Sequence, residues 1–198
     1  VLFRSGQGKL YPESWITLGE PAIMRDLRVI NVAINPVRIN AANYEAQVLT
    51  GINVKLRFTD ESGANEKYRN FEYTTSSFNR IYSNTISNYD YVSPNGESLK
   101  GSLLIIYPTV YGVRALLEPY IEWKQRLGYH VYVDSVSNGA STYGVKAIIQ
   151  NAYDTFYPPL ESAVLVGDAA GTIAISCFNT QGGSTDHDYS ELEGNDVI

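Results

Sequence analysis

The sequence has little cysteine, no long apolar run and no recognisable signal peptide. Each of these absences excludes a class of protein or a kind of site. Cys177 is its one cysteine, which excludes an internal disulfide framework and a multi-cysteine zinc site. No stretch approaches the roughly 18 consecutive apolar residues of a membrane span. The N-terminus lacks the basic-then-apolar layout of a secretion signal. We therefore predict no membrane span and expect the natural start of the protein to lie upstream.

Basic residues are scarce in the second half of the sequence. The first 98 residues hold ten basic and ten acidic residues, whereas the remainder holds five and eleven. After Lys146 there is no lysine or arginine, against eight carboxylates. Because such a field repels nucleic acid and attracts cations, we predict that nucleic acid is not a partner.

Alternation of apolar and polar residues dominates the first half of the sequence. It is clearest in residues 28–34, 46–49 and 52–58, where β-branched residues recur at every second position. Breaks between these runs have the spacing of an antiparallel β-sandwich. The sequence predicts such a domain over 9–92, after a non-native or disordered start at 1–8.

Aromatic residues recur in the last part of this predicted domain. Residues 77–82 and 86–91 alternate Phe or Tyr with Asn and Ser, which indicates a short helix or an irregular arm. Two interpretations stay open: packing on its own sandwich, which is the simpler, or packing against another part of the protein. A Ser-Pro-Asn-Gly sequence then predicts a linker over 93–100.

The second half has the pattern of a parallel α/β unit. Three apolar strands are predicted at residues 103–107, 131–136 and 162–168. Helical periodicity separates them at 113–127 and 142–156. Pro119 inside the first helical pattern predicts a late start or a kink. Strand, helix, strand, helix, strand at this spacing predicts a right-handed parallel unit.

Several side chains in this unit are candidates for chemistry. Asp168 follows the third strand, at the sheet edge where α/β proteins place functional groups, although a turn-forming role is the simpler interpretation. Cys177 and His187 allow a nucleophile–base hypothesis, against which Cys177 fits a small buried position. Asp186 and His187 could lie beside substrate or join a surface network, and His130 is expected to be structural.

Six blocks in this half resemble the opening of the catalytic domain of gingipain-like cysteine peptidases, peptidase family C25. The blocks are Leu103–Pro108, Tyr120–Lys124 with Gly128–Tyr129, Ala147–Gln150 with Tyr153, Val164–Asp168, Thr185–Tyr189 and Glu193–Asp196. Upstream, Phe78–Tyr82 and Asn88–Asp90 are similar to the β-sandwich propeptide that precedes that domain. The resemblance covers nearly the whole chain and implies that residues 101–198 form the first part of a caspase-like α/β domain.

This resemblance implies a secreted or cell-surface endopeptidase, made as a zymogen, that cleaves polypeptides with a catalytic Cys and His. The imidazole helps to form the thiolate that attacks the carbonyl, and backbone donors stabilise the oxyanion. The family's catalytic residues lie beyond the equivalent of Ile198, so we assign none here and expect this fragment to be inactive. No organic cofactor is implied.

Calcium is the one metal that the resemblance implies. The positions that match the family's ligands are Glu193, through its backbone carbonyl, and Asp196. Five carboxylates fall within residues 186–196 without a basic partner, which suits a hard cation, although a solvated acidic loop is an equal alternative. We expect any site within this chain to be incomplete and weak.

The prodomain is expected to cover the C-terminal edge of the sheet in cis and to be released by cleavage near Lys100–Gly101. Two alternatives stay open for the parent protein: a peptidase-like component of a secretion apparatus, or a non-catalytic secreted adhesion or interaction module. Unpaired strands where the sheet ends predict poor solubility.

Overall fold

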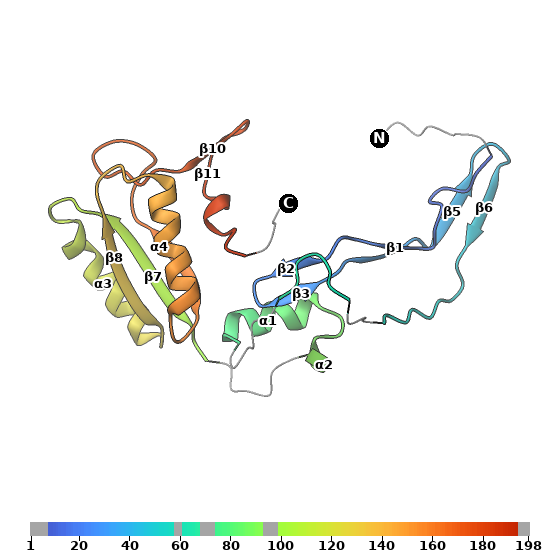
Figure 1. Cartoon of the computed structure of the whole chain (residues 1–198), viewed down its shortest axis with the longest axis horizontal. Coiled ribbons are helices and arrows are strands. Elements are labelled where there is room, and N and C mark those ends of the chain that lie inside the picture. Colours follow the sequence, from blue (N-terminus) through green and yellow to red (C-terminus); the bar gives the residue numbers. More distant parts are fainter. Residues whose placement is uncertain (1–7, 58–60, 68–73, 93–98, 194–198) are drawn as a thin grey trace. The chain divides into compact units, whose positions relative to one another are not determined.

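The computed structural model describes residues 8–57, 61–67, 74–92 and 99–193, which form two compact units (Figure 1). The first unit holds the described residues up to Lys67, and the second holds those from Thr74 to Glu193. Together they make a mixed α/β protein with small antiparallel ladders and one parallel sheet. The start at 1–7 and the first six residues of the predicted linker, 93–98, lie outside the described residues.

Six short strands form the described part of the first unit, and each pairs with one antiparallel partner. The pairs are β1 (Ile16–Leu18) with β4 (Val32–Ile34), β2 (Ala22–Met24) with β3 (Leu27–Val29), and β5 (Val37–Asn40) with β6 (Glu45–Val48). The left-handed backbone of Arg25 and of Tyr44 turns the chain between β2 and β3 and between β5 and β6. The predicted antiparallel pairing is therefore confirmed.

The sandwich prediction differs from the structure in three details. The run 28–34, expected as one strand, is divided between β3 and β4, which belong to different ladders. Residues 52–57, expected to be a strand, have no ladder partner, and Phe58 lies outside the described part. Among the described residues of this unit no apolar side chain is buried, so an interior between two facing sheets is not seen. Alternation predicts a half-covered face, but it does not say what covers that face.

A three-stranded parallel sheet organises the second unit. Its order is β8 (His130–Val136), β7 (Ser102–Pro108), β9 (Leu160–Leu165), so the first strand in sequence lies in the middle. Residues 102–106 and Pro108 of β7 are buried, as a continuous apolar run predicts for a strand covered on both faces. The predicted parallel strands are confirmed, although β9 begins and ends before the expected 162–168.

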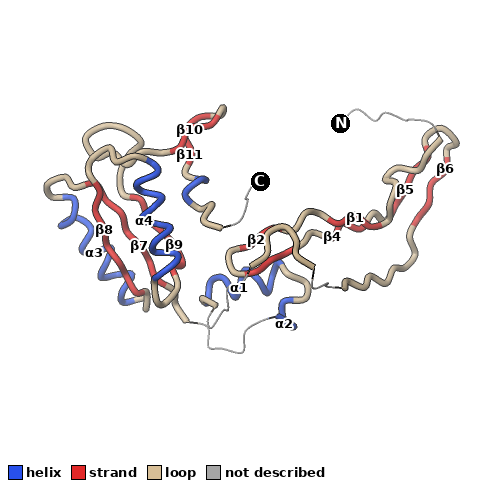
Figure 2. Tube along the Cα trace, viewed as in Figure 1, coloured by secondary structure: helices blue, strands red, loops and turns tan. Residues whose placement is uncertain are grey.

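Helices cover both faces of this sheet (Figure 2). On one face α3 (Val113–Arg126) places Ile121 against Leu103 and Ile105. On the other, α4 (Thr142–Thr155) places its buried side chains in one cluster with Leu104 and Ile106. The unit therefore has three layers, helix, sheet and helix, with a core on each side of β7.

The helix ends follow sequence signals. Ser141 caps α4, its Oγ accepting a hydrogen bond from the Gly144 amide at 3.2 Å, as predicted. Beyond the Leu127 cap of α3, Gly128 adopts a left-handed conformation. Of the two outcomes expected from Pro119, a late start or a kink, the late start is excluded, because α3 begins at Val113 and includes Pro119.

The aromatic segment forms two helices that belong to the second unit. They are α1 (Ser76–Thr85) and α2 (Tyr89–Val92). Tyr82 is fully buried, with its ring centre 5.8 Å from that of Phe78 and 5.5 Å from that of Tyr89. The expected helix is confirmed, but this segment is grouped with the α/β unit and not with the antiparallel strands.

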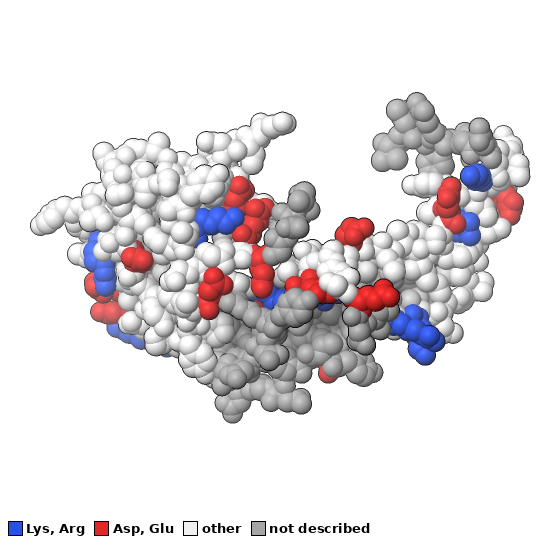
Figure 3. All heavy atoms as spheres, in the orientation of Figure 1, with Lys and Arg blue, Asp and Glu red and all other residues white. Residues whose placement is uncertain are grey.

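After β9 the chain forms a hairpin and a short 3-10 helix. These are β10 (Phe178–Thr180), β11 (Gly183–Thr185) and η1 (His187–Tyr189). Across the described part of the chain, no helix combines the length and apolarity that crossing a membrane requires. Most of the surface in view is uncharged (Figure 3), in keeping with a composition of only 18% charged residues.

Candidate functional site

The loop after β9 places Asp168 at the C-terminal edge of the sheet. The Asp168 carboxylate accepts a hydrogen bond from the Ala169 amide at 2.7 Å, and its backbone pairs with Ile173 and Ile175. Gly167 allows this close approach, because an added Cβ would lie 2.9 Å from the Ile173 carbonyl oxygen. These contacts favour the turn-forming role of Asp168 over a catalytic one.

The acidic loop that follows β11 carries His187 on its surface. The His187 Nε2 lies 3.5 Å from Glu191 Oε1, and the His187 amide donates to Thr185 Oγ1 at 3.1 Å. The side chain is half exposed. Asp186 immediately precedes the 3-10 helix without capping it through its side chain. The structure thus shows His187 in a local surface pair with Glu191, and the substrate-side role of Asp186 and His187 stays a prediction.

Tyr189 fixes the acidic loop to the core of the unit. Its ring packs edge-on against Phe178 at 4.9 Å, and its hydroxyl donates to the Ser176 carbonyl. Burial raises the pKa of the Tyr189 phenol above its ordinary 10.0, and the charge of Asp186 and the nearby Cys177 raise it further. The phenol is therefore a neutral structural donor.

We expect Tyr189→Phe to lower the free energy of unfolding at pH 7 by about 1–3 kcal/mol, because the Ser176 carbonyl loses its donor. Above pH 10 the wild type should lose stability, since Tyr189 ionises in the unfolded chain before it does in the folded one. The variant lacks this loss, so the difference between the two should shrink. Urea denaturation of both proteins at pH 7 and pH 10.5 measures the loss of stability at neutral pH and its decrease at high pH.

Tyr111→Phe is the matched control, because Tyr111 is fully exposed. It should leave stability at pH 7 unchanged. A constant difference between wild type and Tyr189→Phe across this pH range would contradict the assigned role of the phenol.

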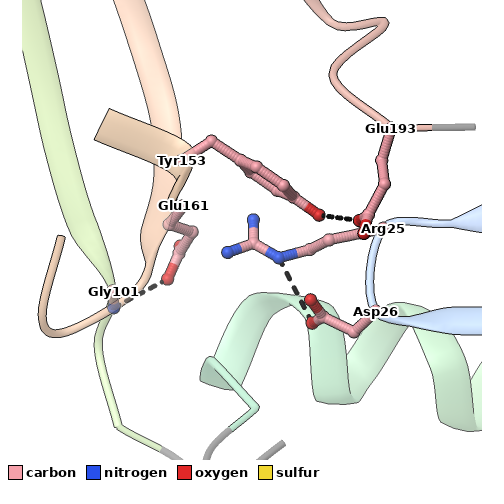
Figure 4. Close-up of polar contacts among 6 residues, drawn as sticks. All are labelled: Arg25, Asp26, Gly101, Tyr153, Glu161 and Glu193. Carbon is pink, nitrogen blue, oxygen red and sulfur yellow. Dashed lines mark hydrogen bonds and ion pairs between the residues drawn. The ribbon is translucent and has the colours of Figure 1, made fainter. Parts of the chain in front are cut away.

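The predicted calcium position lies at the end of the described chain. The Glu193 carboxylate accepts a hydrogen bond from the Tyr153 hydroxyl of α4 at 2.6 Å (Figure 4). Asp196 lies outside the described residues. Within the described ranges, no three His, Cys, Asp or Glu side chains form a group suited to a metal ion. The structure therefore anchors Glu193, and calcium binding stays a prediction.

Cys177 and His187 do not form the arrangement of a nucleophile and its base. Cys177 is a free, half-buried thiol beside Tyr189, and within the described chain its sulfur makes no hydrogen bond with His187. The imidazole instead lies beside Glu191. His130, expected to be structural, begins β8 and lies against the ring of Tyr132 at 4.9 Å.

The sequence pattern does not predict the anchoring role of Tyr153 and Tyr189. Tyr153 and Tyr189 stand in two of the blocks that carried the family resemblance, but nothing in those blocks assigns either hydroxyl a role. Their partners, Glu193 and the Ser176 carbonyl, lie 40 and 13 residues away in sequence. Two sequence features point to such a role: one tyrosine occupies an apolar position of a helix, and the other stands among carboxylates. A buried tyrosine hydroxyl usually has a hydrogen-bond partner.

A comparison with protein families gives a match to the first part of the chain. Residues 3–93 match the family model Propeptide_C25. This range covers the antiparallel unit and extends through α1 and α2. The propeptide resemblance inferred from the sequence is therefore confirmed. No solved structure matches the chain.

Curated relatives extend the likeness in an alignment of 195 residues that covers 96% of the chain. Gingipain R2 of Porphyromonas gingivalis strain W83 is 26% identical, and gingipain R1 of Porphyromonas gingivalis is 25% identical. The chain spans only 26% and 19% of the length of these two proteins.

Proposed function

We propose that the parent protein is a secreted or cell-surface cysteine endopeptidase made as a zymogen, and that residues 3–93, which match the C25 propeptide model, are its propeptide. The observation that carries the proposal is the order of the parts. A matched propeptide region is followed by a parallel α/β unit, and the likeness to gingipains continues across both. The α/β unit is then the first part of the peptidase domain, and we infer a caspase-like fold for it.

The chemistry that we propose is peptide-bond hydrolysis by a Cys–His dyad outside these 198 residues. Two observations support placing it elsewhere: Cys177 is half buried beside Tyr189, and His187 lies beside Glu191. The open sheet edge near Asp168 is where such a dyad would act on a polypeptide. The antiparallel region, in a sandwich arrangement, would cover that edge in cis and keep the enzyme latent.

The test is hydrolysis of fluorogenic peptides by this chain and by a version extended with the downstream coding sequence. We expect the 198-residue chain to be inactive and Cys177→Ser to change nothing. Once the propeptide region has been removed, the extended protein should gain activity that thiol alkylation blocks, because the thiolate is the nucleophile. Replacement of the downstream Cys should then abolish hydrolysis.

Two results would overturn this proposal. Hydrolysis by the 198-residue chain that disappears in Cys177→Ser would restore the dyad of Cys177 and His187. An extended protein without a downstream Cys or His would instead favour a non-catalytic adhesion or interaction module. A dyad specific for C-terminal secretion signals would indicate a secretion-apparatus peptidase.

We also propose a structural calcium site at the end of this chain, through the Glu193 carbonyl and Asp196. The anchor from Tyr153 supports it, because that contact holds the loop in place. Residues 186–196 hold five carboxylates and no lysine or arginine in sequence, and such oxygen ligands suit calcium. Titration of the extended protein with Ca²⁺ or Mg²⁺ tests the site: selective Ca²⁺ binding that Asp196→Asn weakens supports it, and equal response to both ions contradicts it.

A further inference from the structure

One carboxylate joins four segments of the second unit. The Glu161 side chain on β9 accepts hydrogen bonds from the Ser77 hydroxyl of α1 at 2.5 Å and the Tyr129 hydroxyl at 3.2 Å, both on Oε1. Its Oε2 accepts the Gly101 amide at 2.9 Å (Figure 4). Because a carboxylate is an acceptor with two oxygens, it satisfies all three donors at once. Glu161 therefore links α1, the start of β7 and the residue before β8.

Backbone contacts reinforce this junction. Thr75 pairs with Leu99 as a parallel bridge, and the Ser76 amide donates to the Leu99 carbonyl at 2.9 Å. The Ser102 amide donates to the Pro159 carbonyl at 2.9 Å. The residues just before β7 are thus held on one side by the segment that leads into α1, and on the other by the start of β9.

Glycine at position 101 permits this close packing. A Cβ there would lie 2.6 Å from the Glu161 Cβ, 2.8 Å from the Pro159 carbonyl oxygen and 2.8 Å from Thr75 Cγ2. Gly101 is buried although the neighbouring Lys100 is exposed, with its ammonium over the Tyr129 ring. The bond between these two residues consequently starts at the surface and ends in the core.

We propose that Glu161 acts as a carboxylate latch: its hydrogen bonds hold residues 74–86 on the N-terminal edge of the parallel sheet. This docking shields the Lys100–Gly101 bond from proteolysis. A protease binds its substrate as an extended strand, through free backbone donors and acceptors on both sides of the scissile bond. Here the Leu99 carbonyl and the Gly101 and Ser102 amides are already engaged.

The latch connects two regions that the family match separates. Residues 74–86 fall inside the propeptide match, whereas Glu161 lies well outside it. Processing at Lys100–Gly101, which stays a prediction, would need the latch to open first. These contacts hold whether or not the parent protein is a peptidase, so a failed peptidase assignment leaves the latch standing.

Limited digestion of the full chain with a lysine-specific endoprotease tests the latch. Glu161→Gln keeps the shape of the side chain but replaces one carboxylate oxygen by an amide nitrogen, which cannot accept a hydrogen bond. The donors that face that oxygen therefore lose their acceptor. We expect the peptide that begins at Gly101 to appear at least about tenfold faster, as loss of hydrogen bonds to a charged group predicts. Cleavage after Lys146 in α4 should keep its wild-type rate and serves as the internal reference for global unfolding.

Glu122→Gln is the matched control and should change neither rate, because among the described residues Glu122 pairs only with Arg126, on the surface of α3. Amide hydrogen exchange at Ser76 and Asn79 should rise in Glu161→Gln and, more weakly, in Ser77→Ala, which removes a single donor. Unchanged digestion and exchange overturn the proposal. So does an equal acceleration after Lys100 and Lys146, which would mean general destabilisation. If Glu161→Gln fails to fold, Ser77→Ala decides the question. Exchange at Ser76 and Asn79 in that variant at the rate of the wild type would reject the latch.

Discussion

Replacing Leu104 by alanine is expected to lower the free energy of unfolding of the α/β unit by about 2–5 kcal/mol. Leu104 is 1% exposed in the central strand and packs in the cluster that contains Val145 and Ile149 of α4. The truncation removes buried apolar surface and leaves a cavity that the close-packed layers cannot fully close. Urea denaturation followed by Trp123 fluorescence, in a Trp15→Phe background, reports on this unit alone.

Leu116→Ala is the matched control, since it makes the same chemical change at a position of α3 that is 81% exposed. It should alter stability by less than about 0.5 kcal/mol. Similar losses in the two variants would contradict the placement of the core on both sides of β7.

Gly101→Ala is expected to destabilise the same unit by about 1–3 kcal/mol, the usual result of overpacking. The new methyl group would meet the Pro159 carbonyl oxygen at 2.8 Å, and backbone atoms cannot move aside as a flexible side chain does. The shift needed to make room would also lengthen the hydrogen bond from the Gly101 amide to Glu161. Thermal and urea unfolding of the variant measure the loss.

Gly182→Ala supplies the comparison, because the nearest atom to its added Cβ is the Thr180 Oγ1 at 3.8 Å. Its stability should stay near that of the wild type. If Gly101→Ala is equally harmless, the crowding around the start of β7 is absent in solution.

The α/β unit could be predicted from sequence because its signals are local. The apolar run of β7, the helical periodicity of α3 and α4 and the Ser141 cap each specify one element by neighbouring residues. Parallel pairing then follows from the alternation of strands and helices. The boundaries of β9 were displaced, because the apolar run continues past the last ladder residue, Leu165, to Val166.

The first unit was predicted less well because its signals do not specify contacts between distant segments. Alternation in residues 52–57 is typical of a strand, but no partner strand pairs with them among the described residues. Residues 46–49 are predicted as a strand and largely coincide with β6, but no strand is predicted at its partner β5, although a turn joins the two strands directly. A sandwich requires sheets to face each other, and alternation carries no information on which faces meet.

The most informative polar contacts could not be predicted at all. Ser77 and Glu161 are 84 residues apart, and Gly101 and Glu161 are 60 apart. A serine near a helix start and a glutamate in a strand are ordinary surface residues by type. Only the folded arrangement shows that they meet, whereas Asp168 and His187, which sequence patterns single out, make local contacts.

The strand order β8-β7-β9 also determines which contacts can form first while the chain is being synthesised. Synthesis proceeds from the N-terminus, so the middle strand β7 emerges before either neighbour in the sheet has been made. Thr75 and α1 precede it, and the bridge from Thr75 to Leu99 requires no later residue. Glu161 on β9 arrives last. The segment before α1 can thus hold the start of β7 while the nascent sheet is still incomplete, and the carboxylate completes the junction once the third strand docks.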